Sequence, residues 1–515
     1  MTQISHFLVA SAAAQSYDGH RTLALRARST QQEQSFSRTA HIAASIEVNP
    51  FRSALLLFLL FAISFMPILS QNAGQLMALD PTGKFLVNPS TGHPVWIQGD
   101  SPQALGLQVS TADVETYLAD RQSRGYNAVW IILHDEGDQS NKPNNFDNSP
   151  PFDNGVFTNF GSVYWSHMDD VIRRCAAHGM TVVANVTFIG VNAGSGYSLN
   201  HVLAASDATM MAFGALLGKR YKNYNNIIWM LGGDADPGIN GLFAKLQDIA
   251  NGIRSADTVH LITLEACRGC GGASSAEHSA VEATRFVFGK TPSWLTLNWV
   301  YEQYASTAAG CNRAIKEGLP ALIGEDWYEL EHDMTSLQLR NETYWEAFSG
   351  CSLGRLMGNM PIWTMGGPRN ESGKSWQSQL ASQHSVQFAL TGKLMRSRQF
   401  WKLVPDMTHV YLTSGYGSGT DLSVLARTSD GQTMMAYVPN GNRTSVTINL
   451  AGVTDVGGKV KCWWTNPSTG ENKLIGTFSN SGSRTFTAPD SNDWVLTLDS
   501  DATKLCAPGT CSAKN

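Results

Sequence analysis

The chain has 515 residues, a formal net charge of −5 at pH 7 and only 15% charged residues. That length allows two or three domains with a large hydrophobic core, and the slight negative charge excludes a strongly basic nucleic-acid-binding protein. Glycine (47 residues) and tryptophan (14 residues) are abundant, which favours a secreted, loop-rich protein that handles sugars.

Residues 1–74 are predicted to be a leader, because residues 54–66 are almost wholly apolar. Either the first 50 residues belong to a long leader, or the true start lies near Arg52. The apolar run is shorter than the roughly 20 residues that span a bilayer, and it fits the hydrophobic region of a secretory signal. We expect cleavage between Ser70 and Gly74 and a mature N-terminus within residues 71–76. An uncleaved signal anchor, which would tether the protein to a membrane, is the alternative.

Strand and helix patterns alternate between about residues 75 and 405. The predicted strands are residues 95–97, 128–133, 181–184, 227–231, 260–264, 294–297 and 321–323, and either 355–357 or 362–365. Helical patterns such as residues 208–221 and 376–395 follow them. Eight strand–helix units in this length predict a (β/α)8 TIM barrel, an α/β fold.

Polar residues follow nearly every predicted strand of this barrel. They are Asp100, His134, Asp135, Asn185, Asp234, Glu265, Asn298 and Glu325. The carboxyl ends of the strands form the catalytic face of such a barrel. We therefore expect these side chains to line one cleft and to bind substrate there. For His134 and Asp135, a sugar contact or a supporting role is favoured over a metal site.

The helical pattern stops after about Pro405. Short alternating strands and turns such as Asp430-Gly431 fill residues 406–500 and predict a small antiparallel β-sandwich. No supported acid/base pair occurs there, so we expect this part to stabilise or target the barrel without carrying catalysis. Trp463-Trp464 indicates either strand packing or a carbohydrate contact, and residues 501–515 form a tail.

Two acidic residues stand out because each ends an apolar run. Asp234 follows residues 227–231 through two glycines, and Glu325 follows residues 321–323 through one glycine. Hydrolysis of a glycosidic bond needs one carboxylic acid that protonates the leaving oxygen and a second carboxylate. Trp327 and Tyr328 beside Glu325 could form a floor on which a sugar stacks. The alternative is that both acids are solvated or paired residues at strand ends.

Four stretches resemble the apiosidase-like glycoside hydrolase family. They are PVWIQGDSP (94–102), YLADRQSRGYNAVWI (117–131), NNIIWMLGGDADP (225–237) and LPALIGEDWYE (319–329). The C-terminal region is similar to the β-sandwich module, labelled collagen-binding, that follows this barrel in the family. The resemblance covers about residues 80–500. It implies a retaining barrel with Asp234 as acid/base, Glu325 as nucleophile and Asp100 as a pocket residue.

The chain departs from that family at several strand ends. EACRGCGG follows the fifth strand where a histidine is expected, and NWVYEQY and GRLMGNMPIW replace the patterns after the sixth and eighth strands. The resemblance therefore does not fix the sugar. Gly350–Gly354 matches the GxSxG elbow of esterases but follows a predicted helix instead of a strand, and no HExxH zinc motif occurs.

The chain has eight cysteines. Cys506 and Cys511 are predicted to form a disulfide, and Cys267 and Cys270 are a less certain pair. Sequons occur at Asn185, Asn341, Asn370 and Asn442, so the protein would be a glycoprotein in a eukaryotic host. Asn185 is expected to escape glycosylation, because it lies in a predicted strand.

Together these features predict a secreted glycoside hydrolase that needs no cofactor and cleaves plant or microbial polysaccharide or oligosaccharide. We expect no nucleic-acid partner and no membrane contact after signal removal, with a matrix or carbohydrate contact open for the sandwich. A carbohydrate-binding barrel that has lost hydrolysis is the first alternative. An esterase or peptidase is the second.

Overall fold

The structure, a computed structural model, describes residues 77–190, 197–268, 279–439 and 445–513. The predicted leader, its apolar run and its cleavage region lie outside these ranges. Within them, no helix combines the length and the hydrophobicity needed to cross a membrane.

Eight parallel strands form one sheet that curls into a barrel, in the order β8-β7-β6-β5-β4-β11-β10-β9. They are β4 (Ile97–Asp100), β5 (Ala128–Ile132), β6 (Thr181–Asn185), β7 (Ile227–Ala235), β8 (Leu261–Ala266), β9 (Asn298–Tyr301), β10 (Ala321–Glu325) and β11 (Gly354–Met357). The backbone N–H of Thr296, just before β9, donates to the Ile262 carbonyl in β8 at 2.9 Å. This contact joins the two ends of the sheet, so the predicted TIM-barrel fold is confirmed.

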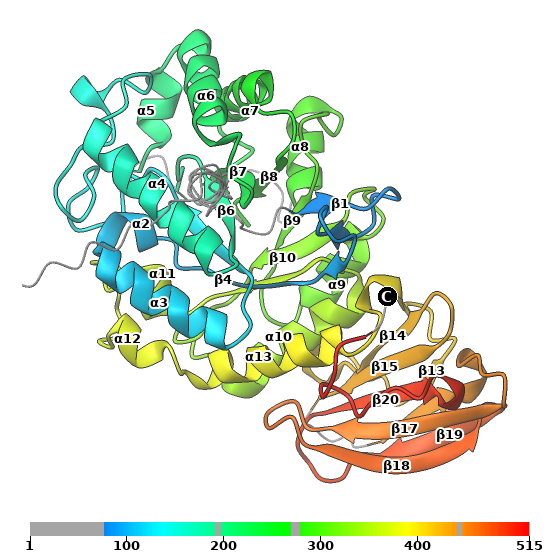
Figure 1. Cartoon of the computed structure of the whole chain (residues 1–515). Helices are drawn as coiled ribbons and strands as arrows, with labels where there is room; N and C mark the ends of the chain where they lie inside the picture. The colour runs from blue at the N-terminus through cyan, green and yellow to red at the C-terminus, as the bar shows by residue number, and fades with distance from the viewer. Residues whose placement is uncertain (1–76, 191–196, 269–278, 440–444, 514–515) are drawn as a thin grey trace, which may run out of the picture. The chain divides into compact units, whose positions relative to one another are not determined.

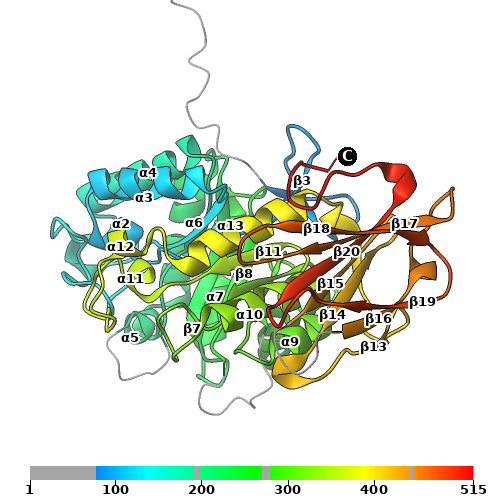
Figure 2. The ribbon, with the colours of Figure 1, turned by 90° about the horizontal axis from the view of Figure 1, so that it is seen from below.

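Helices follow the strands and cover the outside of the barrel (Figures 1 and 2). They are α2 (Leu105–Gln108), α3 (Thr111–Ser123), α4 (Ser162–Ala177), α5 (Leu199–Ala204), α6 (Asp207–Tyr221), α7 (Leu242–Ala256), α8 (Ala280–Phe288), α9 (Thr307–Ala314), α10 (Ser336–Ser349), α11 (Met360–Trp363), α12 (Trp376–Gln379) and α13 (Gln383–Arg396). Local sequence fixes several starts: Ser110 caps α3 by accepting the Asp113 N–H, and Thr335 and Gln338 form a capping box at α10.

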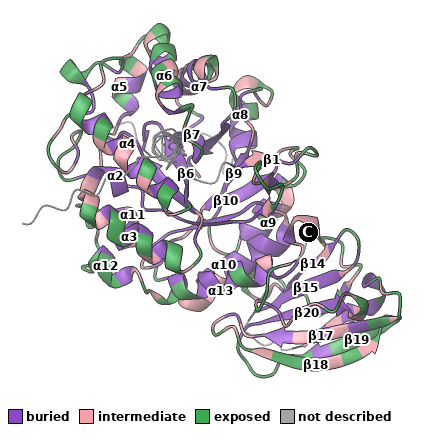
Figure 3. Ribbon diagram, viewed as in Figure 1, coloured by how far each residue is buried: buried purple, intermediate pink, exposed green. Residues whose placement is uncertain are grey.

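The barrel strands are buried on both faces, which explains their continuous apolar runs (Figure 3). Every residue of β5 and β6 is buried. Inside the barrel, Trp130 of β5 packs edge-on against Trp299 of β9, with ring centroids 5.2 Å apart. A rigid, filled interior of this kind holds the residues at the strand ends in fixed positions.

Most predicted strands overlap the observed ones, with bounds that differ by a few residues, but two predicted elements differ more. The prediction of the sixth strand at residues 294–297 is wrong, because β9 begins at Asn298. The predicted helix over residues 376–395 is two helices, α12 and α13. The eighth strand is the first of the two predicted alternatives.

The esterase-like Gly350–Gly354 links helix α10 to strand β11. The strand-to-helix turn that a nucleophile elbow requires is therefore missing at this position.

Two antiparallel sheets follow the barrel, as predicted. One has the order β12-β14-β15-β20-β17-β18 and the other β13-β16-β19. The strands are β12 (Leu403–Pro405), β13 (Leu412–Ser414), β14 (Val424–Thr428), β15 (Thr433–Val438), β16 (Ser445–Asn449), β17 (Lys459–Thr465), β18 (Asn472–Ser479), β19 (Ser483–Thr487) and β20 (Trp494–Ser500). A small antiparallel sheet, β1 (Ala78–Leu79), β2 (Leu86–Val87) and β3 (Pro94–Val95), precedes the barrel.

The six-stranded sheet is buried on both faces where it meets the barrel. Val424 and Ala426 belong to the same hydrophobic core as the barrel strands, whereas Leu425 belongs to the core between the two sheets. Tyr437 of β15 likewise faces the barrel, where its ring stacks on Tyr344 of α10 with centroids 4.8 Å apart. Alternate residues of one strand therefore serve two cores.

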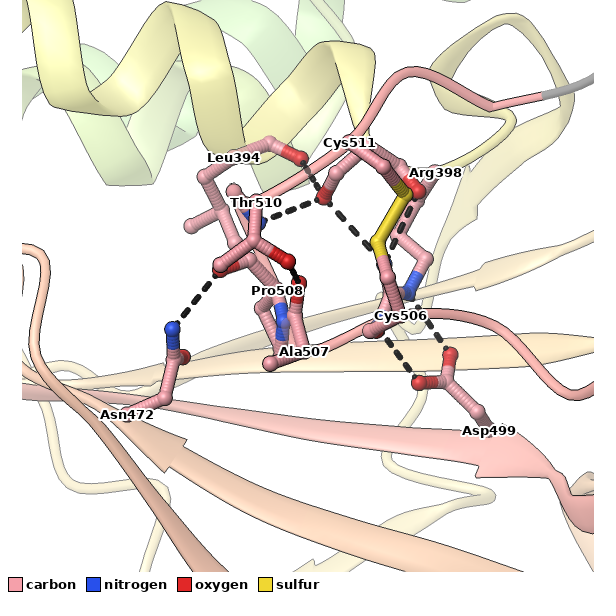
Figure 4. The surroundings of a disulfide bond; sticks show 11 residues. Leu394, Arg398, Asn472, Asp499, Cys506, Ala507, Pro508, Thr510 and Cys511 are labelled. Carbon is pink, nitrogen blue, oxygen red and sulfur yellow. Dashed lines mark hydrogen bonds and ion pairs between the residues drawn. A yellow bond between two sulfur atoms is a disulfide. The ribbon is translucent and has the colours of Figure 1, made fainter.

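The cysteines form more disulfides than the sequence predicted. The predicted Cys506–Cys511 bond is present (Figure 4), and Cys311–Cys351, which was not predicted, ties α9 to the segment before β11. Cys267 is also disulfide-bonded, and Cys270 lies outside the described residues.

The tryptophan pair of the sandwich and the sequon asparagines differ in how far they are buried. Trp464 packs in the sandwich core, whereas Trp463 is half buried. Of the sequon asparagines, Asn185 and Asn341 are buried, Asn370 is half buried and Asn442 lies outside the described residues.

Candidate active site

A cavity of about 590 Å³ opens at the carboxyl ends of the barrel strands. Its lining includes both acids predicted to be catalytic, Asp234 and Glu325, and the predicted Tyr328. The remaining lining residues are Gln103, Asp138, Phe188, Tyr197, Tyr301, Leu330, Glu331, His332, Met360, Trp363, Arg369, Glu371 and Ser372. A cavity of this size, with aromatic walls and several polar groups, suits a small carbohydrate segment.

Asp234 reaches the cavity through an irregularity in β7. Gly232 and Gly233 have φ values of 85° and 90°, and Asp234 itself is left-handed at 54°. The pairing of β7 with β8 shifts register between Gly232 and Ala235. A Cβ at Gly233 would collide with the Phe188 ring, so glycine is needed there to turn the backbone and aim Asp234 into the cavity.

Glu325 is the last residue of β10 and follows a glycine with a clear packing role. A Cβ on Gly324 would overlap the indole ring of Trp299. Without it, the ring of Trp299 lies directly against the β10 backbone beside Glu325. The indole Nε1 then donates to Glu265 Oε1 at 3.0 Å.

Glu265 lies behind the two lining acids and is fully buried. Its carboxyl is hydrogen-bonded to the carboxyl of Glu325 and lies next to the backbone N–H of Asp234. Three acids from β7, β8 and β10 therefore meet at one point: the predicted catalytic pair and Glu265.

Burial shifts the proton affinity of all three acids. The pKa of Asp234 is raised to about 7, chiefly by burial and further by the negative charge of Asp138, while Arg369 opposes the shift. Burial raises the pKa of Glu325 well above its usual range, and the neighbouring Glu265 and Asp234 add to the rise. Acids placed so close together cannot all be ionised at neutral pH.

A polar cluster forms one wall of the cavity. Arg369 Nη1 contacts the Tyr197 hydroxyl at 2.7 Å and Asp138 Oδ1 at 3.3 Å, and the Tyr197 hydroxyl donates to Asp138 at 2.8 Å. On another wall, Trp363 Nε1 donates to Glu331 Oε1 at 2.7 Å. These groups offer fixed donors and acceptors to sugar hydroxyls.

The predicted Trp327 and Tyr328 differ in position. Tyr328 is buried and lines the cavity, and its hydroxyl accepts from Gln103 Nε2 at 3.3 Å. Trp327 is outside the lining, where its ring stacks on His332 with centroids 4.6 Å apart. Trp327 therefore supports His332, which does line the cavity.

Asp100 is predicted as a pocket residue, but the structure places it outside the cavity lining. Its carboxylate pairs with Arg121 Nε at 2.6 Å and accepts from the Tyr117 hydroxyl at 2.6 Å. All three side chains are fully buried. This arrangement joins β4 to α3 and leaves Asp100 no described path to substrate.

His134, Asp135 and Asn185 also lie behind the cavity. His134 hydrogen-bonds Thr187 at 3.0 Å, and Asp135 accepts backbone N–H groups of the loop that carries Asp138. Asn185 Nδ2 donates to the Gly232 carbonyl at 3.2 Å, so it supports the turn that aims Asp234. These positions favour supporting roles over direct sugar contacts.

Asn298 is predicted at the carboxyl end of a strand, but it lies at the opposite end and does not line the cavity. It begins β9 instead of ending it, and its side chain bonds Glu317 at 2.6 Å and the Val281 N–H at 3.1 Å. Tyr301, the last residue of β9, occupies the position expected for Asn298 and lines the cavity.

Sequence reasoning also missed the residues of the long loops. Among them are Asp138 and Tyr197 after β5 and β6, and Arg369 after β11. Loops carry no periodicity, so only their position after barrel strands could have indicated them. Among the described residues, no group of three His, Cys, Asp or Glu is arranged to hold a metal ion.

Residues 80–402 match the family described as "Apiosidase-like, catalytic domain", and residues 404–499 match "Putative collagen-binding domain of a collagenase". No curated protein matches the sequence significantly. A solved structure titled "Glycoside hydrolase" is 22% identical, covers 84% of this chain and 98% of its own, and has a TM-score of 0.68. A glycoside hydrolase family 5 structure from Bacteroides vulgatus is 20% identical over 85% of this chain and 96% of its own, with a TM-score of 0.71. Both show the fold.

Proposed function

The chain belongs to the apiosidase-like family and is a glycoside hydrolase, and we propose that it acts with retention, with Glu325 as nucleophile and Asp234 as acid/base. The observation that carries the proposal is that these two acids, from the ends of β7 and β10, line the same cavity. A retaining enzyme needs two such carboxyl groups on opposite sides of the scissile bond.

The proposed reaction has two steps. In the first, the Glu325 carboxylate forms a bond to the anomeric carbon, the glycosidic C–O bond breaks, and the leaving oxygen takes the proton of Asp234. In the second, water attacks the same carbon, Asp234 takes a proton from the water, and Glu325 leaves as a carboxylate. Two inversions give overall retention.

The environment of Asp234 supports its role as the acid. Burial raises its pKa to about 7, so much of the enzyme holds this proton at neutral pH. A catalytic acid that later acts as a base works best with a pKa near the working pH.

We propose a segment of plant or microbial polysaccharide or oligosaccharide as substrate. The aromatic side chains of Tyr301, Tyr328, Trp363 and Phe188 line the cavity and offer flat apolar surfaces to sugar rings. Among the described residues, none of those that line the cavity belongs to the sandwich, so we assign the sandwich stabilisation instead of chemistry.

The first experiment is a screen against aryl glycosides and against pectic, arabinan and glucan polymers. On a substrate found there, Glu325→Gln should remove nearly all turnover. Asp234→Ala should retain turnover of substrates with good leaving groups, because these need little protonation. Glu371→Gln, an exposed residue on the cavity rim, is the control and should stay within a few-fold of the parent.

The stereochemistry is read separately. Proton NMR of the first product should show the anomeric configuration of the substrate. An inverted product would refute the nucleophile role, and tight binding of oligosaccharide without turnover by the parent protein would indicate a carbohydrate-binding barrel instead.

We also propose that the protein is exported. The disulfides Cys311–Cys351 and Cys506–Cys511 support this, because such bonds persist in oxidising compartments. N-terminal sequencing of secreted material tests the proposal, with a first residue within 71–76 expected. Recovery of a chain that retains residues 54–66 in membranes would favour a signal anchor.

A further inference from the structure

Glu265 occupies a position that neither the catalytic pair nor the cavity wall explains. It is fully buried in β8 and does not line the cavity, yet its carboxyl contacts that of Glu325. A third acid directly behind a nucleophile adds negative charge where a second carboxylate is already present. Such an arrangement is costly unless a proton compensates for it.

The hydrogen bonds of Glu265 show where that proton must be. Oε1 accepts the indole N–H of Trp299 at 3.0 Å. Oε2 is buried, and no N–H or O–H donor in the described parts of the chain makes a well-formed hydrogen bond to it. The remaining partner is the carboxyl of Glu325. Two carboxylates both accept, so a hydrogen bond between them requires one proton between the two groups.

Among the described residues, the groups that act on the pair do not supply a compensating positive charge. The titratable neighbours are Asp234 on β7, Tyr301 on β9, and Tyr328 and Glu331 after β10. Arg369 acts on Asp234 and is already engaged with Asp138 and Tyr197. A shared proton is therefore the compensation that the geometry allows.

We propose that Glu265 is a positioning residue that shares a single proton with Glu325 and so holds the nucleophile in place. This inference rests on the proposed role of Glu325. When the proton lies on Glu265, it donates to the Glu325 carboxylate, which is then free to attack. Trp299 fixes the opposite oxygen of Glu265, and Gly324 lets the Trp299 ring reach it.

The proton shared by Glu265 and Glu325 does not change the proton balance of the reaction. During attack the Glu325 oxygen bonds to the anomeric carbon while Glu265 keeps its proton. When water releases the sugar, Glu325 becomes a carboxylate again and Glu265 donates to it once more. The proton delivered to the leaving group comes from Asp234, and water returns it.

The direction of the pKa shifts agrees with the geometry. Burial and the charge of Asp234 raise the pKa of Glu265, and burial together with Glu265 raises that of Glu325. The pair titrates as a unit, and it should hold its proton at pH 7.

Infrared spectroscopy tests the shared proton without any need for activity. Buried carboxylic acids give a C=O band distinct from that of carboxylates. At pH 7, Glu265→Gln and Glu325→Gln should each remove the same single band, because the amide then donates to the remaining carboxylate. Loss of two separate bands would mean two protons, and no change would mean none; either result overturns the proposal.

Kinetics test the positioning role. Glu265→Gln keeps a donor and should stay within about tenfold of the parent in kcat/KM, whereas Glu265→Leu should lose about 10²-fold, as expected for a misplaced reacting group. In Glu265→Leu the acidic limb of the pH profile should shift relative to that of the parent, because Glu325 then titrates alone instead of sharing a proton with a neighbouring carboxyl. Equal losses and unshifted profiles in both variants would refute positioning. If the parent shows no hydrolysis, the infrared result still decides whether the proton is shared.

Discussion

Arg398, just after the last barrel helix, and Asp499, in the last sandwich strand, form a bidentate ion pair that is almost completely buried. Its two N–O distances are 2.9 and 2.7 Å, and the side chains are 0% and 3% exposed. Arg398 also donates to the carbonyl of Cys506, which links the pair to the disulfide loop of the tail (Figure 4). The pair fastens the sandwich to the barrel.

Breaking this pair should destabilise the protein strongly. Asp499→Ala leaves the Arg398 guanidinium buried without its partner, which typically costs about 3–5 kcal/mol. Asp501→Ala is the control, because its ion pair with Lys504 is exposed and should be worth about 1 kcal/mol or less. Urea unfolding followed by fluorescence measures both variants. Equal, small losses would show that Arg398 finds other partners.

Removing the sandwich should prevent the barrel from folding stably. A chain ending at Pro405 would expose Tyr344 and the other α10 residues that β14 and β15 cover, together with the unpaired Arg398. We expect aggregation or binding of a hydrophobic dye, and recovery when residues 406–513 are supplied in trans. A soluble truncated monomer with cooperative unfolding would contradict this. If it also lost all turnover on small soluble substrates, the assignment of catalysis to the barrel alone would fail.

A methyl group at Gly324 should lower activity by displacing the ring of Trp299. Gly324→Ala places a Cβ inside the Trp299 ring, which must then move away from Glu265. We expect a loss of about 10²-fold in kcat/KM. Gly457→Ala is the control, because its Cβ would meet only the Asp455 carboxylate at 3.2 Å. Unchanged kinetics in Gly324→Ala would mean that the position of Trp299 is not critical.

Activity should decrease as pH rises through about 7. The cause is loss of the Asp234 proton, since burial raises that pKa to about 7. A kcat/KM profile measured from pH 5 to 9 tests this. A basic limb that survives in Asp234→Ala would have to come from another group.

The free energy of unfolding should also depend on the protonation of Asp234. Between pH 4 and 7 the folded Asp234 binds a proton that the unfolded chain has lost, so the free energy of unfolding falls as pH rises. Asp234→Asn should therefore stabilise the protein more at pH 8 than at pH 5. Asp333→Asn is a matched control, because Asp333 is exposed and has φ of 53° against 54° for Asp234. Equal effects at both pH values would refute the assignment.

The sequence predicted the acids that face the cavity because simple rules place them. Asp234 and Glu325 end apolar runs, and the carboxyl ends of barrel strands converge. The prediction for Asn298 is wrong because the apolar residues before it resemble a strand. Trp294 and Leu297 are buried, but they belong to a loop. Apolar character alone cannot separate a buried loop from a strand.

The buried ion pair of Asp100 could not be predicted from the sequence either. Its partner Arg121 lies on a helix about 20 residues away, and nothing in the intervening sequence shows that this arginine turns inward. Similarly, Cys311 and Cys351 are 40 residues apart, a spacing that has no signature. Pairings across the fold depend on packing, which one-dimensional patterns do not record.

The two-sided burial of the six-stranded sheet has a consequence for how the chain is made. Synthesis runs from the N-terminus, and domains usually fold as they emerge. Here α10 is synthesised before β14 and β15, the strands that cover it. Arg398 likewise lacks its partner until Asp499 is made, about a hundred residues later. The barrel can therefore reach its final stability only after β20 has been synthesised, and until then α10 exposes apolar surface to which chaperones can bind.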